Sequence, residues 1–520
     1  MRKKIIFVLT TIVLFACNKK TDNLIQIRVT DSVINIMQGG FGASMHAIED
    51  SLPVSTYNGN YRSYGGSAWG GNPPAEDSAR WNQIYQHCDW LGLDWCRVEI
   101  EHRMFEPQKG KFTFNNKEMH ILYRWLDYCQ HRNVDVYLTE MWPHARWLVH
   151  KNFLGDGIKE LLSAPSDFNA WADGLTRLLN FLINEKKYTC IKWLSIVNEP
   201  MEEWSWWKKA DGSSQDIIDG LKIMKEKLAA AGLPVKLVAT DGSLKYETKA
   251  IEKYLPYIGA ISFHDYSATY DWWNSKPFIA DDVDAIGLFK KLGRENGNLP
   301  VFMAEFGTMM FGFTKDTNAP SQWRSMLHDV QLMIRMSQAG IDGMNRWSLT
   351  NRGDLDGQWQ LIDTWDTATK SLRKNITPHV NAYYGIGLIT RFTAKNSEVL
   401  HTIVDGGKDT LVFERLDHSK DTVHRVFATT FRKDNNYSIF ITNDSEQEYP
   451  LELTFEKGRM PLPLYLYAIN EKDHKDKINC LIEPIEINPY GKSIKGVIRP
   501  KSLMVYTTYK LSHTEKGIIE

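Results

Sequence analysis

The stretch Ile191-Lys-Trp-Leu-Ser-Ile-Val-Asn-Glu-Pro200 decides how the rest of the chain is interpreted. Its first seven residues are mostly apolar and partly β-branched, which predicts a buried strand that is covered on both faces. The strand then ends in an amide, a carboxylic acid and a proline, whose ring cannot continue the ladder of hydrogen bonds. Polar groups at the carboxyl end of a buried parallel strand lie where α/β barrels place their chemistry. The stretch therefore predicts that Asn198 and Glu199 lie at a functional edge of a parallel sheet.

A second stretch, Leu299-Pro-Val-Phe-Met-Ala-Glu-Phe-Gly307, has the same form and ends its apolar run at Glu305. A lone acid at a strand end often only caps the helix that follows it. Two glutamates at the ends of two buried strands are instead typical of a glycosidase, which needs a pair of carboxyl groups. The two stretches together favour a catalytic pair.

Strand and helix patterns alternate between residues 39 and 390, and eight strands that are each followed by a helix predict a (β/α)8 TIM barrel. The predicted strands are 39–46, 94–101, 134–140, 191–197, 234–240, 259–266, 299–307 and 341–349. A doubly wound sheet is the alternative, but it would show a glycine-rich turn for phosphate. The sequence contains neither GxGxxG nor GxxxxGK[ST].

The residue pattern changes after Arg391, where short runs of alternating polar and apolar residues are broken by Asp, Asn, Gly and Lys. This pattern predicts an antiparallel β-sandwich over residues 391–520. Residues 24–37 also alternate, and we expect this strand to join the sandwich because a lone strand needs a sheet. The 520 residues thus divide into a tether with an N-terminal strand (18–38), a catalytic barrel (39–390) and the sandwich.

Residues 1–17 have the pattern of an export signal, in which the charges of Arg2 to Lys4 precede an apolar run that is too short to span a bilayer. The sequence Leu14-Phe-Ala-Cys17 resembles a bacterial lipoprotein signal. That resemblance implies cleavage before Cys17, lipidation of its thiol, and a place at the outer membrane, on either the periplasmic or the surface face. The alternative is an ordinary secretory signal with an incidental cysteine.

Composition narrows the range of partners. A formal net charge of -1 gives no reason to expect nucleic acid or an anionic membrane surface. The chain has 18 tryptophans, and flat apolar rings suit the faces of sugars. Trp142, Trp206 and Trp272 follow the third, fourth and sixth strands, which predicts an elongated cleft for an oligo- or polysaccharide.

The sequence has six cysteines, of which the five after Cys17 show no metal-ligand spacing. We expect buried free thiols, no metal, no cofactor and a monomer.

The polar residues at the strand ends form a set that resembles the glycoside hydrolases of clan A, which are retaining (β/α)8 enzymes. The set consists of Arg97, Asn198, Glu199, His264, Tyr266, Glu305 and Trp347. Its most specific part is Asn198-Glu199-Pro200 on the fourth strand together with Glu305 on the seventh. The Gly40-Phe-Gly-Ala start and the trailing sandwich are similar to families 30 and 39, whereas the His-x-Tyr on the sixth strand is closer to family 5.

The resemblance implies that Glu199 is the general acid/base and Glu305 the nucleophile of a double displacement on a β-linked glycan. It also implies that Arg97 and Tyr266 stabilise an ionised Glu305. Asn198 would bind the sugar 2-hydroxyl, His264 would contact the substrate, and Trp347 would form the floor of the subsite that holds the cleaved sugar.

Structural alternatives exist for three of these residues: an ion pair of Arg97 with Glu99 or Glu101, a hydrogen-bonded core position for His264, and barrel packing for Trp347. Two other functions also remain open. One is a metal-dependent sugar isomerase in which Glu199, Asp241, His264 and Glu305 hold Mg²⁺ or Mn²⁺. The other is a non-catalytic glycan-binding lipoprotein. The export signal, the asparagine before Glu199 and the many tryptophans disfavour the isomerase, and the intact pair of glutamates disfavours the binding protein.

Overall fold

The computed structural model describes most of the chain between residues 23 and 511, and the account below is confined to this part. The described ranges are 23–47, 71–142, 145–155, 160, 162–200, 207–266, 281–308, 321–351, 359–379, 381–407, 409–414, 419–458, 460–475, 482–487 and 492–511.

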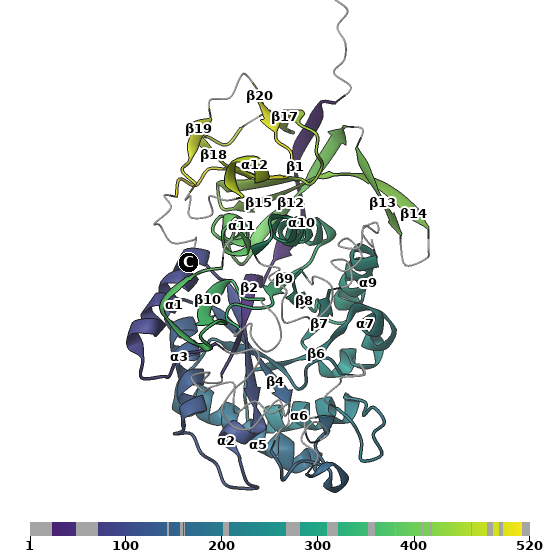
Figure 1. Cartoon of the computed structure of the whole chain (residues 1–520). Coiled ribbons are helices and arrows are strands. Elements are labelled where there is room, and N and C mark those ends of the chain that lie inside the picture. The colour runs from purple at the N-terminus through teal and green to yellow at the C-terminus, as the bar shows by residue number, and fades with distance from the viewer. Residues whose placement is uncertain are drawn as a thin grey trace, which may run out of the picture.

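A closed barrel of eight parallel strands forms the larger body (Figure 1). Its strands are β2 (Gly40–His46), β3 (Trp95–Glu101), β4 (Asp135–Trp142), β5 (Ile191–Ser195), β6 (Lys236–Ser243), β7 (Ala260–Asp265), β8 (Val301–Phe306) and β9 (Gly343–Arg346). The first and last strands pair in parallel, with Gly40 opposite Gly343, and this pairing closes the ring. The (β/α)8 prediction is therefore confirmed.

The strands read as apolar runs because both of their faces are covered. In β3 every residue is buried, and the side chains alternate between the helices and the barrel interior. Trp95 packs inside the barrel against Tyr137 and Phe302, whereas Cys96 and Val98 belong to the core under the helices. Arg97 and Glu99 continue the inward-facing series of Trp95, so the interior turns from apolar to charged towards the carboxyl end of the strand.

Helices surround the barrel: α1 (Ser78–Leu91), α2 (His102–Phe105), α3 (Lys117–His131), α5 (Phe168–Asn180), α6 (Ile218–Ala230), α7 (Leu244–Ala250), α9 (Asp281–Glu295), α10 (Trp323–Ala339) and α11 (Ala382–Thr390). Short helical turns are η2 (Lys151–Phe153), η3 (Phe181–Glu185), η4 (Ile251–Lys253) and η5 (Leu255–Tyr257). Asp77, Asn116 and Asp167 cap α1, α3 and α5 by accepting a hydrogen bond from a backbone N–H of the first turn. Within the described part, no helix is long and apolar enough to cross a bilayer.

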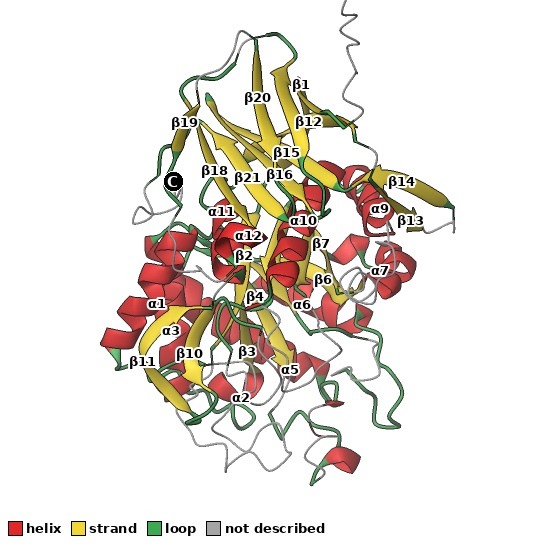
Figure 2. Ribbon diagram, turned by 45° about the horizontal axis from the view of Figure 1, so that its top comes forward, coloured by secondary structure: helices red, strands yellow, loops and turns green. Residues whose placement is uncertain are grey.

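A β-sandwich domain lies on the barrel beside α10 and α11 (Figure 2). Its nine strands follow one another in the order β19-β18-β21-β16-β15-β12-β1-β17-β20. They are β1 (Ile25–Met37), β12 (Ser397–Gly406), β15 (Val426–Lys433), β16 (Asn436–Asn443), β17 (Tyr449–Phe455), β18 (Leu464–Asn470), β19 (Ile485–Ile487), β20 (Ser493–Ile498) and β21 (Ser502–Thr507), with the short α12 (Glu471–His474) after β18. The sheet folds over its own core, because Gly496 on β20 lies against the hydroxyl of Tyr506 on β21, six places away in this order.

The N-terminal strand ties the two bodies together. β1 pairs antiparallel with β12 and parallel with β17, and the chain then enters β2 of the barrel.

The alternating run that begins at Asp409, which the sequence predicts as a strand of the sandwich, lies outside the nine-stranded sheet. Among the described strands, β13 (Thr410–Glu414) pairs with β14 (Lys420–His424) alone, and this hairpin is separate from the nine-stranded sheet (Figure 2). Local alternation predicts a strand but does not identify its partner. The hairpin of β10 (Ile362–Asp366) and β11 (Ser371–Pro378), which packs on α1, has no counterpart in the predicted elements.

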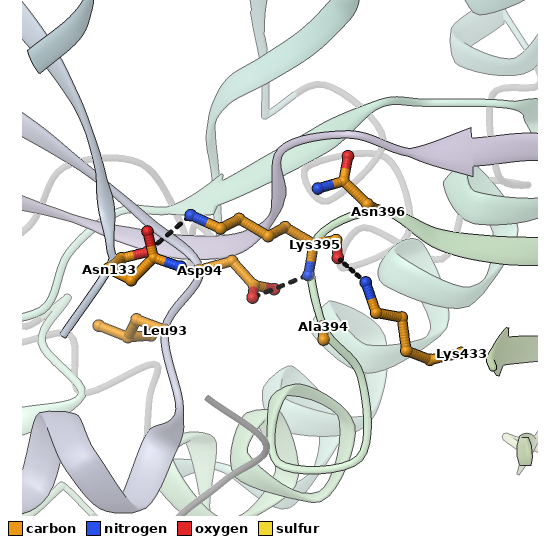
Figure 3. A pocket seen from close by; sticks show the side chains of 7 residues that line it. All are labelled: Leu93, Asp94, Asn133, Ala394, Lys395, Asn396 and Lys433. Atoms are coloured by element: carbon orange, nitrogen blue, oxygen red, sulfur yellow. Dashed lines mark hydrogen bonds between the residues drawn. The ribbon is translucent and has the colours of Figure 1, made fainter. Parts of the chain in front are cut away.

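The barrel and the sandwich also meet at a small polar pocket at the amino ends of β3 and β4 (Figure 3). The buried carboxylate of Asp94 accepts hydrogen bonds from the backbone N–H groups of Phe41 and Lys395, at 3.1 and 2.9 Å. Nζ of Lys395 donates to the carbonyl oxygen of Asn133 at 2.6 Å. This pocket lies at the opposite end of the barrel from the predicted chemistry, and its groups join the two domains.

The four cysteines in the described part, Cys88, Cys96, Cys129 and Cys190, are buried free thiols.

Candidate active site

The two predicted glutamates meet at the carboxyl ends of the barrel strands. Glu305 is the fifth residue of β8, and Glu199 follows β5 in a backbone conformation with a φ of 43°. This left-handed conformation is costly for a residue with a side chain, and such residues gather at functional sites. The backbone N–H of Glu199 donates to the carbonyl oxygen of Asp241 at 2.8 Å, which helps to hold the conformation in place.

Glu305 is held by one donor at each carboxylate oxygen. Nη1 of Arg97 donates to Oε1 at 2.7 Å, and the hydroxyl of Tyr266 donates to Oε2 at 2.9 Å. The carboxylate therefore has a fixed orientation within the barrel mouth.

Arg97 is fully buried and serves several acceptors at once. Its Nη1 also pairs with Oε1 of Glu99 at 2.5 Å, and its Nη2 donates to Oδ1 of Asn198 at 2.6 Å. The ion pair with Glu99 thus exists beside the contact with Glu305, whereas Glu101 pairs with Arg103 instead. A bidentate, permanently charged guanidinium suits this task, because it can hold several oxygens in one plane.

His264 lies between the two glutamates. Its Nδ1 is 3.0 Å from Oε1 of Glu199 and 3.5 Å from Oε2 of Glu305. On the other side of the ring, Nε2 is 3.8 Å from Oδ1 of Asp241. His264 is therefore a buried ring surrounded by three carboxylates, which favours its protonated form.

Burial and neighbouring charges both shift the pKa values of these groups. Burial raises the pKa of Glu305 to about 7, and the charge of Glu199 adds to the rise, while His264 and Arg97 act to lower it. Burial disfavours the charged form of His264, but Glu305, Glu199 and Asp241 together raise its pKa above the ordinary value. The pKa of Asp241 is lowered, because Arg97 and His264 outweigh the effect of its burial.

Of the four tryptophans predicted for the site, the structure describes the ring of Trp347. Trp347 directly follows β9, is buried, and packs edge-on against His46 with ring centroids 5.6 Å apart. Trp142 ends β4, but the position of its ring is not among the described features. Trp206, Trp272 and Cys17 lie outside the described residues.

Three residues around the site, Trp359, Tyr137 and Ser262, have no counterpart among the predicted ones. Trp359 packs edge-on against Tyr266, with ring centroids 6.1 Å apart, and comes from a segment without periodic pattern. Tyr137 lies inside the barrel and donates a hydrogen bond to Asp241. Its position on a predicted strand, inward-facing like Arg97, was the available signal.

A metal site is the structural rival at this position. Glu199, His264 and Glu305 each offer a ligand atom, and these atoms lie within 4.8 Å of one another. A divalent ion there would have to share Glu305 with the guanidinium of Arg97, which is a permanent cation. Asp241, the fourth ligand of the isomerase hypothesis, is instead hydrogen-bonded to Tyr137 and Ser262. The donor set fits a carboxylate pair held by cations better than it fits a metal ion.

A closed (β/α)8 barrel, followed by a β-sandwich that the N-terminal strand joins, is the fold that this chain shares with solved glycoside hydrolases. The similarity to these structures extends over almost the whole chain. An endoxylanase of glycoside hydrolase family 30 from Clostridium papyrosolvens is 13% identical over 93% of this chain and 99% of its own, with a TM-score of 0.59.

An endo-β-1,6-glucanase is 13% identical over 94% of both chains, with a TM-score of 0.57. A family 51 α-L-arabinofuranosidase from Thermotoga petrophila is 12% identical over 93% of this chain and 100% of its own, with a TM-score of 0.59. No protein-family profile and no curated protein matches the sequence. The similarity is therefore one of fold.

Proposed function

We propose that the protein is a retaining glycoside hydrolase that cleaves β-linked glycans by double displacement. The observation that carries the proposal is the separation of the two acids, since an oxygen of Glu199 lies within 4.8 Å of an oxygen of Glu305. Retaining enzymes hold their carboxyl groups about 5–5.5 Å apart, whereas inverting enzymes leave about 6.5–9.5 Å for a water molecule. The glycosidases among the structurally similar proteins add support at the level of fold.

The surroundings of the two acids suggest which one attacks. The Glu305 side chain is 6% exposed and is held at both oxygens, as a nucleophile aimed at the anomeric carbon requires. The Glu199 side chain is 18% exposed and thus nearer to solvent, with which an acid/base exchanges its proton. We assign Glu305 as the nucleophile and Glu199 as the general acid/base.

The coupling of the two acids suits a mechanism that needs one proton between them. Because the charge of Glu199 raises the pKa of Glu305, protonation of Glu199 favours ionisation of Glu305. In the first step the Glu305 carboxylate attacks the anomeric carbon while Glu199 gives its proton to the departing oxygen. In the second step Glu199 takes a proton from water, which attacks the anomeric carbon and releases Glu305.

Asn198 is oriented for a substrate contact. Its Oδ1 accepts the hydrogen bond from Arg97, so its amide nitrogen is left to donate elsewhere. We assign that donor to the 2-hydroxyl of the sugar that is cleaved. His264 and Trp347 then complete the subsite around this sugar.

We further propose that the mature protein is a lipoprotein of the outer membrane. The support comes from the signal sequence that ends at Cys17. Asn23, where the described chain begins, lies six residues after Cys17, and six residue steps can span about 20 Å. The sandwich, which β1 enters at Ile25, would therefore lie close to the membrane.

A panel of β-linked oligosaccharides with sizing of the products tests the activity. The anomeric configuration of the first product, followed by NMR before mutarotation, tests the mechanism. We expect retention for the wild type and no turnover for Glu305→Gln. An inverted product would rule out double displacement, and loss of activity in EDTA would favour the metal-dependent alternative.

A further inference from the structure

Asp241 is a buried carboxylate beneath the catalytic pair, and the mechanism above does not use it. It lies within β6 and has no exposed surface. Its Oδ1 accepts hydrogen bonds from the hydroxyls of Tyr137 and Ser262, which come from β4 and β7. A buried charge is costly unless it is paired and hydrogen-bonded. The buried carboxylate of Asp241 therefore either lowers the stability of the fold or serves a function.

The remaining contacts of the carboxylate lead to both catalytic acids. Its Oδ2 lies 3.3 Å from Nη2 of Arg97, the residue that holds Glu305. Its Oδ1 lies 3.8 Å from Nε2 of His264, whose opposite nitrogen is 3.0 Å from Glu199. One carboxylate therefore faces the cation that orients the nucleophile and the ring that orients the acid/base.

The backbone of the same residue makes a third connection. The carbonyl oxygen of Asp241 accepts the N–H of Glu199 at 2.8 Å. Both residues have a positive φ, 54° for Asp241 and 43° for Glu199. Two costly backbone conformations joined by a hydrogen bond are typical of a site that is held in one geometry.

We propose that Asp241 is the positioning residue that fixes the two catalytic glutamates relative to each other, by holding Arg97, His264 and the backbone of Glu199 at once. The inference rests on the proposed function and adds a residue to it. Asp241 has no surface that could touch a substrate, so it acts through its neighbours.

The charges around Asp241 determine what its removal does. The groups that face this layer of the barrel are Arg97 and Glu99 from β3, Tyr137 from β4, Asn198 and Glu199 after β5, Ser262 and His264 from β7, and Glu305 from β8. Asp241 is one of the negative charges that raise the pKa of His264. Its loss makes a proton harder to keep on His264.

The test is Asp241→Asn, which keeps the shape and the acceptor for the two hydroxyls but removes the charge. We expect kcat to fall by about 100-fold with little change in KM, because a misplacement of about 1 Å costs about that much. We also expect the alkaline limb of the kcat profile to move to lower pH by about one unit, because His264 loses its proton at lower pH without the negative charge of Asp241. In the enzyme without substrate, the imidazole NMR signal of His264, assigned by its loss in His264→Gln, should titrate at lower pH than in the wild type.

Asp342→Asn is the matched control. Asp342 is also a buried barrel aspartate, paired with Lys290 at 2.7 Å, but it lies at the amino end of β9. It should leave the pH profile and the titration of His264 as they are in the wild type. A Tyr137→Phe, Ser262→Ala double variant keeps the Asp241 charge but releases its orientation, and we expect a lower kcat with the wild-type pH limbs.

The proposal is overturned if Asp241→Asn has the wild-type kcat, or if its kcat falls while the alkaline limb and the His264 titration stay in place. If Asp241→Asn does not fold, the double variant decides, and an unchanged kcat there overturns the proposal. The His264 titration needs no substrate. A wild type that cleaves no glycan would therefore refute the proposed function without deciding the role of Asp241.

Discussion

Arg97 donates from Nη1 to Oε1 of Glu305 at 2.7 Å, inside a barrel where the arginine has no contact with solvent. An uncompensated charge of either sign would be expensive at this depth. The arginine therefore does two things, since it stabilises the ionised carboxylate and it fixes its direction. The same guanidinium orients Asn198, so the predicted nucleophile and the predicted ligand of the 2-hydroxyl share one support.

We expect Arg97→Lys to lower kcat/KM by at least about 100-fold, because an ammonium cannot reproduce the planar fork that serves Glu305 and Asn198 together. Arg97→Met should in addition lower the free energy of unfolding by about 3–5 kcal/mol, since it leaves buried carboxylates without a partner. Steady-state kinetics and denaturant titration measure the two effects. Equal losses of activity in both variants, without a difference in stability, would contradict the role of the charge.

His264 should set the acid limb of the activity profile. Its positive charge lowers the pKa of Glu305, so its removal raises that pKa. The nucleophile must be ionised, and activity is lost as the pH falls through the pKa of Glu305. We therefore expect the acid limb of kcat/KM in His264→Gln to move to higher pH by about one unit. His120→Gln, a change of an exposed histidine on α3, is the control. An acid limb that stays in place would show that His264 does not act on Glu305.

The barrel could be predicted from the sequence because its strands repeat the same pattern, a buried apolar run that ends in polar residues. Parallel strands that are covered on both faces read as apolar runs, and all eight predicted runs overlap an observed strand, although β4 and β6 continue past the predicted ends to Trp142 and Ser243. The sandwich was harder to predict from the sequence, because strands such as β12 mix polar and apolar residues along a partly exposed surface. The separation of the β13–β14 hairpin from the nine-stranded sheet depends on contacts that no local pattern encodes.

The site was predictable to the extent that its residues stand at strand ends. Glu199, His264 and Glu305 meet, as do Arg97 and Asn198, because parallel strands deliver their ends to one rim. The supporting layer beneath them could not be derived in the same way. Asp241 also ends a predicted strand, but only the fold shows that it faces Arg97 and Tyr137 rather than a ligand.

Cell fractionation tests the predicted anchor. Buried acyl methylenes contribute about 0.8 kcal/mol each, so a protein with two or more acyl chains on Cys17 should stay with the membrane fraction. We expect Cys17→Ala to release the protein from that fraction. Unchanged membrane retention of the variant would contradict lipidation at this cysteine.

The predicted tryptophan cleft can be tested with substrates of different length. If Trp206 and Trp272 lie along an elongated cleft, their replacement by alanine should weaken binding of long oligosaccharides more than binding of short ones, because only long chains reach distant subsites. The KM values of a size series measure this. Equal effects on short and long substrates would mean that the two rings only support their loops.

Varying the leaving group of the substrate should distinguish the roles of the two glutamates. Glu305→Ala removes the nucleophile, so we expect a loss of several orders of magnitude on every substrate. Glu199→Ala removes proton donation, which a dinitrophenyl glycoside does not need because its leaving group departs as a stable anion.

With that substrate the Glu199→Ala variant should still form the glycosyl-enzyme, yet it lacks the base that activates water. We therefore expect a burst of dinitrophenol followed by slow turnover, and azide should restore turnover because it attacks without losing a proton. Stopped-flow absorbance measures the burst, and NMR identifies the glycosyl azide. A Glu199→Ala enzyme that is equally slow on activated and natural substrates, with no response to azide, would show that Glu199 is not the acid/base.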